Sequence, residues 1–264
     1  MQNQPTISIL IPAYNEESFL PQTLHSVHAS FAAISRSDYE IVVCDNNSTD
    51  ATSQIALAGN AHVVFEPHNG FSHSRNAAAR AARGEWFIFL DADTLLSPQL
   101  LRVTLDHLAT GKVGGGGAAV NLDTNRPGWF GAMFCWSWNR LSSLRKLAPG
   151  PYTFCLRRVW QETGGFPEDV YYTEDIIFSK RLQRWCRAHN MRVTIITEAS
   201  ALTSSRKLEW FTTGQLIRQL LTICIPGSIK RRDHLHIWYR RPAAASKNQT
   251  TNKAKSLASS KSSA

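Results

Sequence analysis

The segment Trp86-Phe-Ile-Phe-Leu-Asp-Ala-Asp-Thr94 joins an unbroken apolar run to two carboxylates one residue apart. Consecutive apolar residues leave no polar face for water, so the run predicts a strand that is buried on both faces. Asp91 and Asp93 follow it with their side chains on one side of the chain. Ligands of open α/β sheets bind at the carboxyl ends of strands, where two carboxylates suit a hard divalent cation. Because Asp is also common in turns after strands, this segment alone leaves a metal site and an ordinary turn open.

Strands and helices alternate over the first 110 residues around this segment. Apolar runs at 7–11, 39–44 and 63–65 predict three further strands, and Pro12 is expected to end the first of them. Helical spacing predicts helices after residues 15–18, over roughly 72–83 and over 98–109, and residues 46–50 offer turn and N-cap chemistry for one more. The alternation predicts a single α/β domain with a mostly parallel sheet and helices on both faces.

The pattern loosens in the second half of the chain. The glycine run at 114–117 predicts a loop or a strand that needs a close approach, rather than a phosphate loop. The aromatic segment 129–138 predicts a less regular region that covers or extends the sheet. Residues 174–188 predict a helix with apolar residues on one side.

The overall composition fits a soluble globular protein. The chain has 264 residues, a 43% hydrophobic fraction and a mean hydropathy of −0.25. It has no apolar stretch as long as the roughly 18 residues of a membrane-spanning helix, and its first residues lack the features of a signal peptide. We therefore expect cytoplasmic residence. The five cysteines are scattered without a Cys-x-x-Cys pair, which argues against a disulfide framework or a zinc site.

The positive charge is concentrated at the carboxyl end of the chain. Residues 226–264 hold nine Lys or Arg and one acidic residue, so they carry +8 of the net +9. Such a segment predicts an anionic membrane or nucleic-acid partner, or only a solvated tail. The sequence shows no nucleic-acid-binding motif, so no nucleic acid is expected. We assign 210–241 to a helical, basic extension and 242–264 to a disordered tail.

The extension contains an apolar run between Leu216 and Ile225 that is bounded by Lys230-Arg-Arg232. This pattern fits an interfacial helix that would hold the chain peripherally at the inner face of the cell membrane. It fits equally well a helix that docks on the catalytic domain and ends at Pro226.

Polar clusters also follow the other predicted strands. Asn15 and Glu16 follow the first strand, residues 45–47 the second, and residues 69–76 the third. Each cluster alone is ordinary turn chemistry, but successive parallel strands place all of them on one rim. The rim offers carboxylates for ribose hydroxyls or a base, an arginine for phosphate and the Asp91–Asp93 pair for a metal.

Four ordered motifs resemble those of family 2 glycosyltransferases with the GT-A fold. They are Pro12-Ala-Tyr-Asn-Glu-Glu17, Val43-Cys-Asp-Asn-Asn-Ser-Thr-Asp50, Arg75-Asn76 and Phe89-Leu-Asp-Ala-Asp93. Thr163-Gly-Gly-Phe166 and Tyr172-Thr-Glu-Asp175 resemble the acceptor-side motifs of that family. The resemblance covers residues 5–205 and implies a catalytic domain over 1–209. Its nucleotide-sugar half would be about 5–112 and its acceptor half about 113–209.

The resemblance also implies roles for individual residues. Asp175 would be the general base, with Glu174 beside it, and Asp93 would bind Mn²⁺ or Mg²⁺ with Asp91 near the ribose and the metal. The nucleotide-binding residues implied are Pro12, Tyr14, Glu16, Asp45, Asn47, Arg75, Asp91 and Arg206. From the residues alone, Arg75 fits a helix surface as well as a phosphate contact, and Glu174-Asp175 fits the acidic first turn of an ordinary helix.

The activity implied is inverting, metal-assisted transfer of a sugar from a nucleoside diphosphate donor, which we expect to be UDP-linked. The acceptor would be a saccharide or a lipid-linked hydroxyl, as in the synthesis of cell-envelope polysaccharide or glycolipid. Two alternatives stay open. Asp91-Ala-Asp93-Thr94 also fits haloacid-dehalogenase-like phosphatases, and a sugar-nucleotide-binding protein without catalysis would keep the same rim.

Overall fold

The computed structural model describes residues 4–124, 128–206, 210, 212–215, 218 and 222. The chain divides into two compact units, residues 1–205 and 206–264, and the fold below is that of the first. All of the predicted interfacial helix at 216–225 except residues 218 and 222, the basic residues 230–232 and the tail 242–264 lie outside the described residues.

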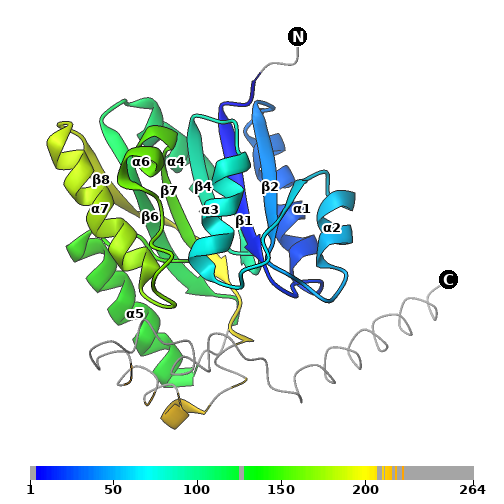
Figure 1. Cartoon of the computed structure of the whole chain (residues 1–264). Coiled ribbons are helices and arrows are strands. Elements are labelled where there is room, and N and C mark those ends of the chain that lie inside the picture. The colour runs from blue at the N-terminus through cyan, green and yellow to red at the C-terminus, as the bar shows by residue number, and fades with distance from the viewer. Residues whose placement is uncertain are drawn as a thin grey trace. The chain divides into compact units, whose positions relative to one another are not determined.

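Eight strands form one mixed sheet in the order β3-β2-β1-β4-β7-β6-β8-β5 (Figure 1). Their bounds are Ile7–Ala13 (β1), Tyr39–Asp45 (β2), His62–Phe65 (β3), Trp86–Leu90 (β4), Thr94–Leu95 (β5), Val113–Leu122 (β6), Tyr152–Leu156 (β7) and Arg192–Thr203 (β8). Strands β1 to β4 are parallel, β7 is antiparallel to β4 and β6, and β5 is antiparallel to β8. The sheet is therefore mostly parallel, as predicted, and its β1–β4 part has all its carboxyl ends at one edge.

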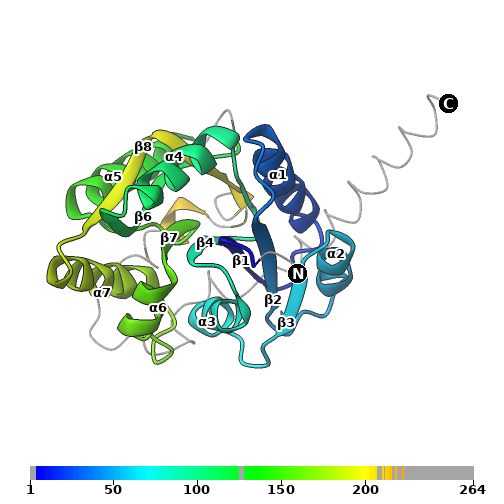
Figure 2. The same cartoon turned by 90° about the horizontal axis from the view of Figure 1, so that it is seen from above.

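Helices cover both faces of the sheet (Figure 2). Their bounds are Leu20–Ala33 (α1), Thr52–Ala58 (α2), Phe71–Ala81 (α3), Pro98–Ala109 (α4), Gly128–Arg145 (α5), Arg157–Thr163 (α6) and Glu174–Ala188 (α7). Helices α1, α4 and α5 lie on one face, and α3, α6 and α7 lie on the other. The α/β fold with helices on both faces is confirmed.

Alternate residues of the central strands build two apolar cores. Ile7, Ile9 and Ile11 of β1 point into a core with α1 and α4, whereas Leu10 of the same strand points into a core with α3, α6 and α7. In β4, Phe87 and Phe89 join the second core and Ile88 joins the first, all without exposed surface. The unbroken apolar run therefore marks a strand buried on both faces, as its sequence predicts.

The first strand does not end at Pro12 as expected, because β1 continues to Ala13. Pairing with β4 stops at Leu10, whereas pairing with β2 continues to Ala13. Beyond Leu10 the strand therefore has a neighbour on one side only, where the missing N–H of proline costs no ladder hydrogen bond.

The aromatic segment 129–138 was expected to be irregular, but it lies within the helix α5. Its glycine, Gly131, and its closely spaced tryptophans hide the helical period. The glycine run at 114–117 is part of β6, which settles the choice between loop and strand. A Cβ on Gly116 would overlap the carbonyl of Thr194 on the neighbouring β8, so the close approach expected there is confirmed.

The helix starts differ in detail from their sequence predictions. The N-cap of α2 is Ala51, which makes no side-chain cap, and the Asp50 carboxylate instead accepts a hydrogen bond from Thr52 N at 2.9 Å. Helix α1 begins at Leu20, so Glu16 and Glu17 precede it and its first turn has no acidic residue.

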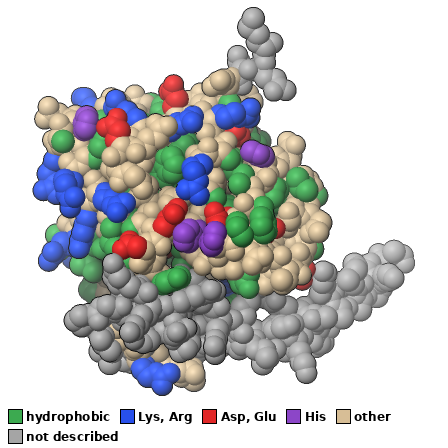
Figure 3. All heavy atoms as spheres, in the orientation of Figure 1, with side chains coloured by type: hydrophobic (Ala, Val, Ile, Leu, Met, Phe, Trp, Pro, Cys, Tyr) green, Lys and Arg blue, Asp and Glu red, His purple; other side chains and the backbone are tan. Residues whose placement is uncertain are grey.

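Lys and Arg side chains gather over the part of the surface that α7 covers (Figure 3). That helix contributes Lys180, Arg181, Arg184 and Arg187. The first 225 residues carry a net charge of only +1, but their positive side chains are unevenly distributed over the surface.

Candidate active site

The predicted rim forms at the carboxyl edge of the parallel strands. Pro12 lies at the end of β1 beside Cys44 of β2, and Asp45 is the last residue of β2. Asp91 and Asp93 follow β4, the strand that pairs with β1 on its other side. Asp45 is buried, whereas both carboxylates after β4 are partly exposed. The topology thus places these sequence-predicted residues along one edge.

Hydrogen bonds tie together the two loops after β1 and β2. Asn15 N donates to Ser48 Oγ at 3.0 Å, and Asn15 Oδ1 accepts from Thr49 N at 2.7 Å. Ser48 N in turn donates to the Asp45 carboxylate at 2.9 Å. Asn15 and Asn47 have φ angles of 54° and 65°, in the left-handed region that Asn tolerates better than most residues. Tyr14 and Glu16 lie in the same loop, the first 42% exposed and the second buried.

The Asp91–Asp93 turn is held from three sides. Asp91 N donates to Pro151 O at 3.2 Å, and Thr94 N closes the turn on Asp91 O at 3.0 Å. Ser204 N, just after β8, donates to Asp93 O at 3.1 Å. The two carboxylates are thus presented by a turn of fixed backbone, which is what a preformed ligand site requires.

Arg75 joins the carboxylates after β4 to those at the start of α7. Its guanidinium donates to Glu174 at 2.7 Å, to Asp91 at 2.9 Å and to Gly150 O at 3.2 Å. The side chain is only 3% exposed, so a helix-surface role is wrong. Burial alone would lower the pKa of Arg75, but Asp91, Glu174 and Asp175 raise it above its ordinary value. This arginine is a fixed cation between the two acidic motifs.

Asp175 is the most strongly perturbed carboxyl group of this site. Burial and then the charge of Glu174 raise the pKa of Asp175 to about 7, although Arg75 and the backbone amides of Ile176 and Gly150 oppose that rise. Ile176 N donates to Asp175 Oδ1 at 2.8 Å. A carboxylate that takes up protons near neutral pH has the basicity of an effective general base.

The N-terminus of α7 combines an acidic first turn with an unusual backbone. The N-cap Thr173 has a φ of 65°, the left-handed conformation, and makes no side-chain cap. The alternative of an ordinary acidic first turn explains the position of Glu174 and Asp175 near the helix dipole. It does not explain why Glu174 is buried and paired with an arginine 99 residues away.

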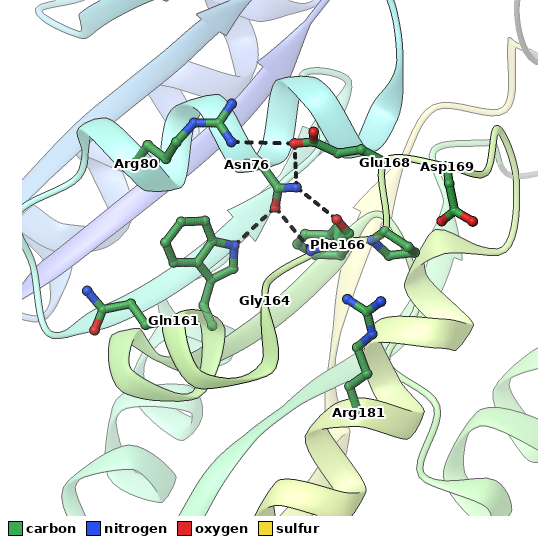
Figure 4. Close-up of a pocket in the computed structure, with 10 residues that line it drawn as sticks. Asn76, Arg80, Gln161, Gly164, Phe166, Glu168, Asp169 and Arg181 are labelled. Atoms are coloured by element: carbon green, nitrogen blue, oxygen red, sulfur yellow. Dashed lines mark hydrogen bonds and ion pairs between the residues drawn. The ribbon is translucent and has the colours of Figure 1, made fainter.

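Asn76 holds the segment between α6 and α7, a role that the sequence did not indicate. Its Oδ1 accepts from Phe166 N and Trp160 Nε1 at 3.0 and 3.1 Å, and its Nδ2 donates to Phe166 O and Glu168 at 2.8 and 2.9 Å (Figure 4). Gly165 has a φ of 63°, and a Cβ there would lie 2.6 Å from Asn76 Oδ1. Thr163-Gly-Gly-Phe166 is thus a segment shaped to receive Asn76.

An open cavity of about 580 Å³ lies beside this segment and is distinct from the carboxylate edge. Figure 4 shows Arg80, Glu168 and Asn76 on one side of it and Arg181 on the other. None of the carboxylates at 91, 93, 174 and 175 lines it. The cavity therefore adds no group to the predicted reaction centre.

The donor atoms after β4 fit a hard divalent cation that shares its shell with phosphate. Among the described residues, no cluster of three His, Cys, Asp or Glu could enclose a metal by itself. Asp91 and Asp93 offer carboxylate oxygens at a partly open edge, and Mg²⁺ typically uses one or two carboxylates together with substrate phosphates and water. Asp91 also pairs with Arg75, which leaves Asp93 as the principal candidate ligand.

Arg206 belongs to the second unit of the chain. Its guanidinium lies over the Trp210 ring, 5.5 Å from the centroid. Its predicted contact with the diphosphate stays a prediction.

Comparison with known proteins identifies the architecture. Residues 8–158 match the family model described as "Glycosyl transferase family 2", and residues 86–244 match "Glycosyl transferase family group 2". These comparisons give no support to the phosphatase alternative.

Two curated relatives match over shorter stretches. Undecaprenyl-phosphate 4-deoxy-4-formamido-L-arabinose transferase of Pseudomonas fluorescens is 39% identical over 35% of this chain and 29% of its own. The putative teichuronic acid biosynthesis glycosyltransferase TuaG of Bacillus subtilis is 32% identical over 40% of this chain and 42% of its own. The chain thus spans less than half the length of these relatives.

Two solved structures share the fold at low identity. The mannosyltransferase PcManGT of Pyrobaculum calidifontis, in complex with GDP-Man and Mn²⁺, matches 89% of this chain and 69% of its own at 20% identity and a TM-score of 0.58. Glucosyl-3-phosphoglycerate synthase of Mycobacterium tuberculosis, with Mn²⁺, UDP-Glc and phosphoglyceric acid, matches 85% and 81% at 21% identity and a TM-score of 0.56. With more than half of its residues matched by the family model, the chain belongs to glycosyl transferase family 2.

Proposed function

We propose that this chain transfers a sugar from a nucleoside diphosphate donor to a hydroxyl acceptor with inversion of the anomeric centre. The observation that carries the proposal is the Asp91–Arg75–Glu174 chain, which ends at a neighbouring carboxylate, Asp175, of raised pKa. It brings a donor-side edge and a basic group together. An inverting transfer needs that combination, because the acceptor must lose a proton while its oxygen attacks.

Each of the predicted site residues has a role that follows from its position. Asp45 and the loops at 14–16 and 45–47 bind the base and the ribose, and Asp91 with Asp93 faces the diphosphate. A divalent cation held by Asp93 would neutralise charge on the leaving diphosphate. Asp175 accepts the acceptor proton at a carboxylate oxygen, and Glu174 keeps that carboxylate basic by its charge.

Arg75 contributes through position and charge. Its contacts with Asp91 and Glu174 fix the spacing between the donor edge and the base. Because its pKa is raised, it stays cationic throughout and does not exchange protons with the carboxylates beside it.

We propose a UDP-linked donor and a saccharide or lipid-linked acceptor. The solved structures of related fold include TarS of S. aureus with UDP-GlcNAc and the mycobacterial synthase with UDP-Glc, although PcManGT holds GDP-Man. The name of the Pseudomonas relative places its sugar on undecaprenyl phosphate, and that of TuaG places it in teichuronic acid synthesis. These names support a role in building the cell envelope.

A panel of UDP-, GDP- and dTDP-sugars tests the donor, by thermal stabilisation with and without Mn²⁺. We expect a UDP-sugar to raise the melting temperature only when Mn²⁺ or Mg²⁺ is present. Asp93→Ala should abolish that metal-dependent shift, whereas Asp106→Ala, at an exposed position of α4, should keep it. A shift that survives Asp93→Ala would refute the metal ligand, and a larger shift with GDP- or dTDP-sugars would refute the base.

Donor hydrolysis and transfer test the reaction itself. The wild-type chain should release UDP from the stabilising donor, and Asp175→Asn should reduce that release to background. Release of inorganic phosphate from phosphomonoesters, without use of any nucleotide sugar, would overturn the proposal.

A further inference from the structure

Helix α5 makes some of its contacts with the rest of the chain through polar residues. Asn139 is hydrogen-bonded to both backbone groups of Val120 in β6, at 3.0 Å from Val120 N and 2.9 Å to Val120 O. Ser142, with no exposed surface, donates to Leu147 O at 2.6 Å. A helix normally turns its apolar stripe to the core and its polar side to water. Here the inward side includes two hydrogen-bonded polar residues, of which Ser142 is fully buried and Asn139 partly buried.

The outward side of α5 carries the large apolar residues. Trp136 is 66% exposed and Leu144 is 78% exposed, and Met133 and Leu141 are also exposed. All four lie on the outward half of the helix, together with the exposed Ser137 and Arg140, and we call this set of apolar residues the α5 stripe. Single exposed apolar residues are normal, but a continuous stripe rimmed by polar groups marks an interaction surface.

The charged residues within α5 and directly after it are all positive. The Arg140 guanidinium lies over the Trp136 ring, 5.9 Å from the centroid, and Arg145 and Lys146 follow at the end of the helix. Residues 128–146 contain no Asp or Glu. Tryptophan and leucine on one side of a helix, with arginine and lysine beside them, are typical of helices that lie in a membrane interface.

Charge argues against two occupants of the α5 stripe, the chain's basic end and a second copy of the helix. The chain's own residues 226–264 carry a net +8 and would be repelled by Arg140, Arg145 and Lys146. A second copy of the helix would bring three like charges against the same three. An anionic lipid surface satisfies the apolar stripe and the positive rim together. None of the described helices is long and apolar enough to cross a membrane, so the contact would be at the surface.

We propose that α5 docks the chain on an anionic lipid surface. Val120 lies near the carboxyl end of β6. Strand β6 runs in the same direction as β1, because β6 and β4 are both antiparallel to β7 and β4 is parallel to β1. The helix therefore packs close to the sheet edge that carries Asp91 and Asp93 (Figure 1). Docking through α5 brings that edge to the lipid. The proposal goes beyond sugar transfer and does not depend on it.

Flotation of the full chain with vesicles tests the proposal without any substrate. One set of vesicles contains phosphatidylcholine alone, and the other contains equal amounts of phosphatidylcholine and phosphatidylglycerol. The double variant Trp136→Ser, Leu144→Ser removes the two most exposed members of the stripe. Leu57→Ser is the matched control, since Leu57 is 61% exposed on α2, away from α5.

We expect the wild-type chain to float with the anionic vesicles, and less so as salt is raised. The double variant should partition about tenfold less, and Leu57→Ser should partition as the wild type does. Circular dichroism and melting temperature check that the variants fold. Should the double variant fail to fold, Arg140→Gln with Arg145→Gln, which touches only exposed positions, should weaken flotation at low salt.

Three outcomes would overturn the proposal. The first is that the wild-type chain does not float with anionic vesicles, and the second is that the folded double variant floats as the wild type does. The third is a wild-type dimer that the double variant dissociates, which would make a second copy the occupant of the stripe. Because none of these outcomes involves a donor sugar, failure here is separate from failure of the transferase assay.

Discussion

Replacing Asp175 by Asn is expected to stabilise the fold while it removes the proposed base. The pKa of Asp175 rises from 3.8 to about 7, which corresponds to at most about 4 kcal/mol of unfavourable free energy once the group is ionised. Asn keeps an acceptor for Ile176 N but gives up the second carboxylate oxygen. We therefore expect a net gain of about 1–3 kcal/mol in the free energy of unfolding above neutral pH.

The pH dependence of this gain has a definite sign. A carboxyl group with a raised pKa in the folded state contributes stability below its unfolded pKa and loses it as the pH rises through the folded pKa. Wild-type stability should therefore fall between about pH 4 and pH 7 by a term that Asp175→Asn lacks. The variant should match the wild type near about pH 4, and its advantage should level off above about pH 7.

Replacing the neighbouring Glu174 by Gln is expected to lower the free energy of unfolding instead. Glu174 is buried and bonded to Arg75 at 2.7 Å, so Glu174→Gln leaves a buried guanidinium short of one counter-charge. Breaking a buried pair from one side costs about 3–5 kcal/mol, a value that Asp91 reduces here because it remains bonded to Arg75. Two adjacent acidic residues are thus expected to shift stability in opposite directions.

Urea unfolding of both variants at about pH 5 and about pH 8, beside transfer activity, measures these differences. Asp106→Asn, an exposed change on α4, should stay within about 0.5 kcal/mol of the wild type. A less stable Asp175→Asn above neutral pH, or a gain that is the same at both pH values, would refute the electrostatic origin of the raised pKa. Full transfer activity in the same variant would remove Asp175 from the role of base.

Two further predictions concern the segment that Asn76 holds. Asn76→Ala should cost about 2–4 kcal/mol, because it leaves buried donors and acceptors unpaired, and hydrogen exchange of the Phe166 amide should accelerate. Gly165→Ala should cost about 2–4 kcal/mol, against about 1 kcal/mol for Gly111→Ala, which has a similar φ of 65° but no atom within 4 Å. Since a Cβ at Gly165 would clash with Asn76 Oδ1, the two changes should be less than additive in one chain, and simple additivity would contradict the contact.

Local sequence was sufficient to predict the strands and helices of the proposed donor half, because its signals are local. The apolar run of β4 identifies its own burial, and Asp91 and Asp93 follow directly. Parallel strands then gather their ends at one edge without any knowledge of side-chain packing. Pro12 misled the prediction of the end of β1, because a proline is tolerated where only one neighbouring strand remains.

The structure of residues 113–205 could not be predicted in the same way, because it depends on contacts between residues distant in sequence. The glycines of β6 are explained only by the close approach of neighbours distant in sequence, such as Cys186 beside Gly114, Phe154 beside Gly115 and Thr194 beside Gly116. In helix α5 several large apolar residues, Trp136 and Leu144 among them, face outward, whereas its inward residues include Asn139 and Ser142. A method that expects apolar residues to face the core reads such a helix as irregular.

Arg75 shows why a correct motif was not enough to predict its contacts. Its helix is rich in alanine on every side, so the sequence has no stripe that marks Arg75 as buried. Only the folded chain brings Glu174, 99 residues later, to within 2.7 Å of it. Because one guanidinium holds Asp91 after β4 and Glu174 on α7, neither acidic motif can shift without breaking a buried ion pair. The proposed donor edge and the proposed base are therefore mechanically coupled, and a substitution at either should alter the position of the other.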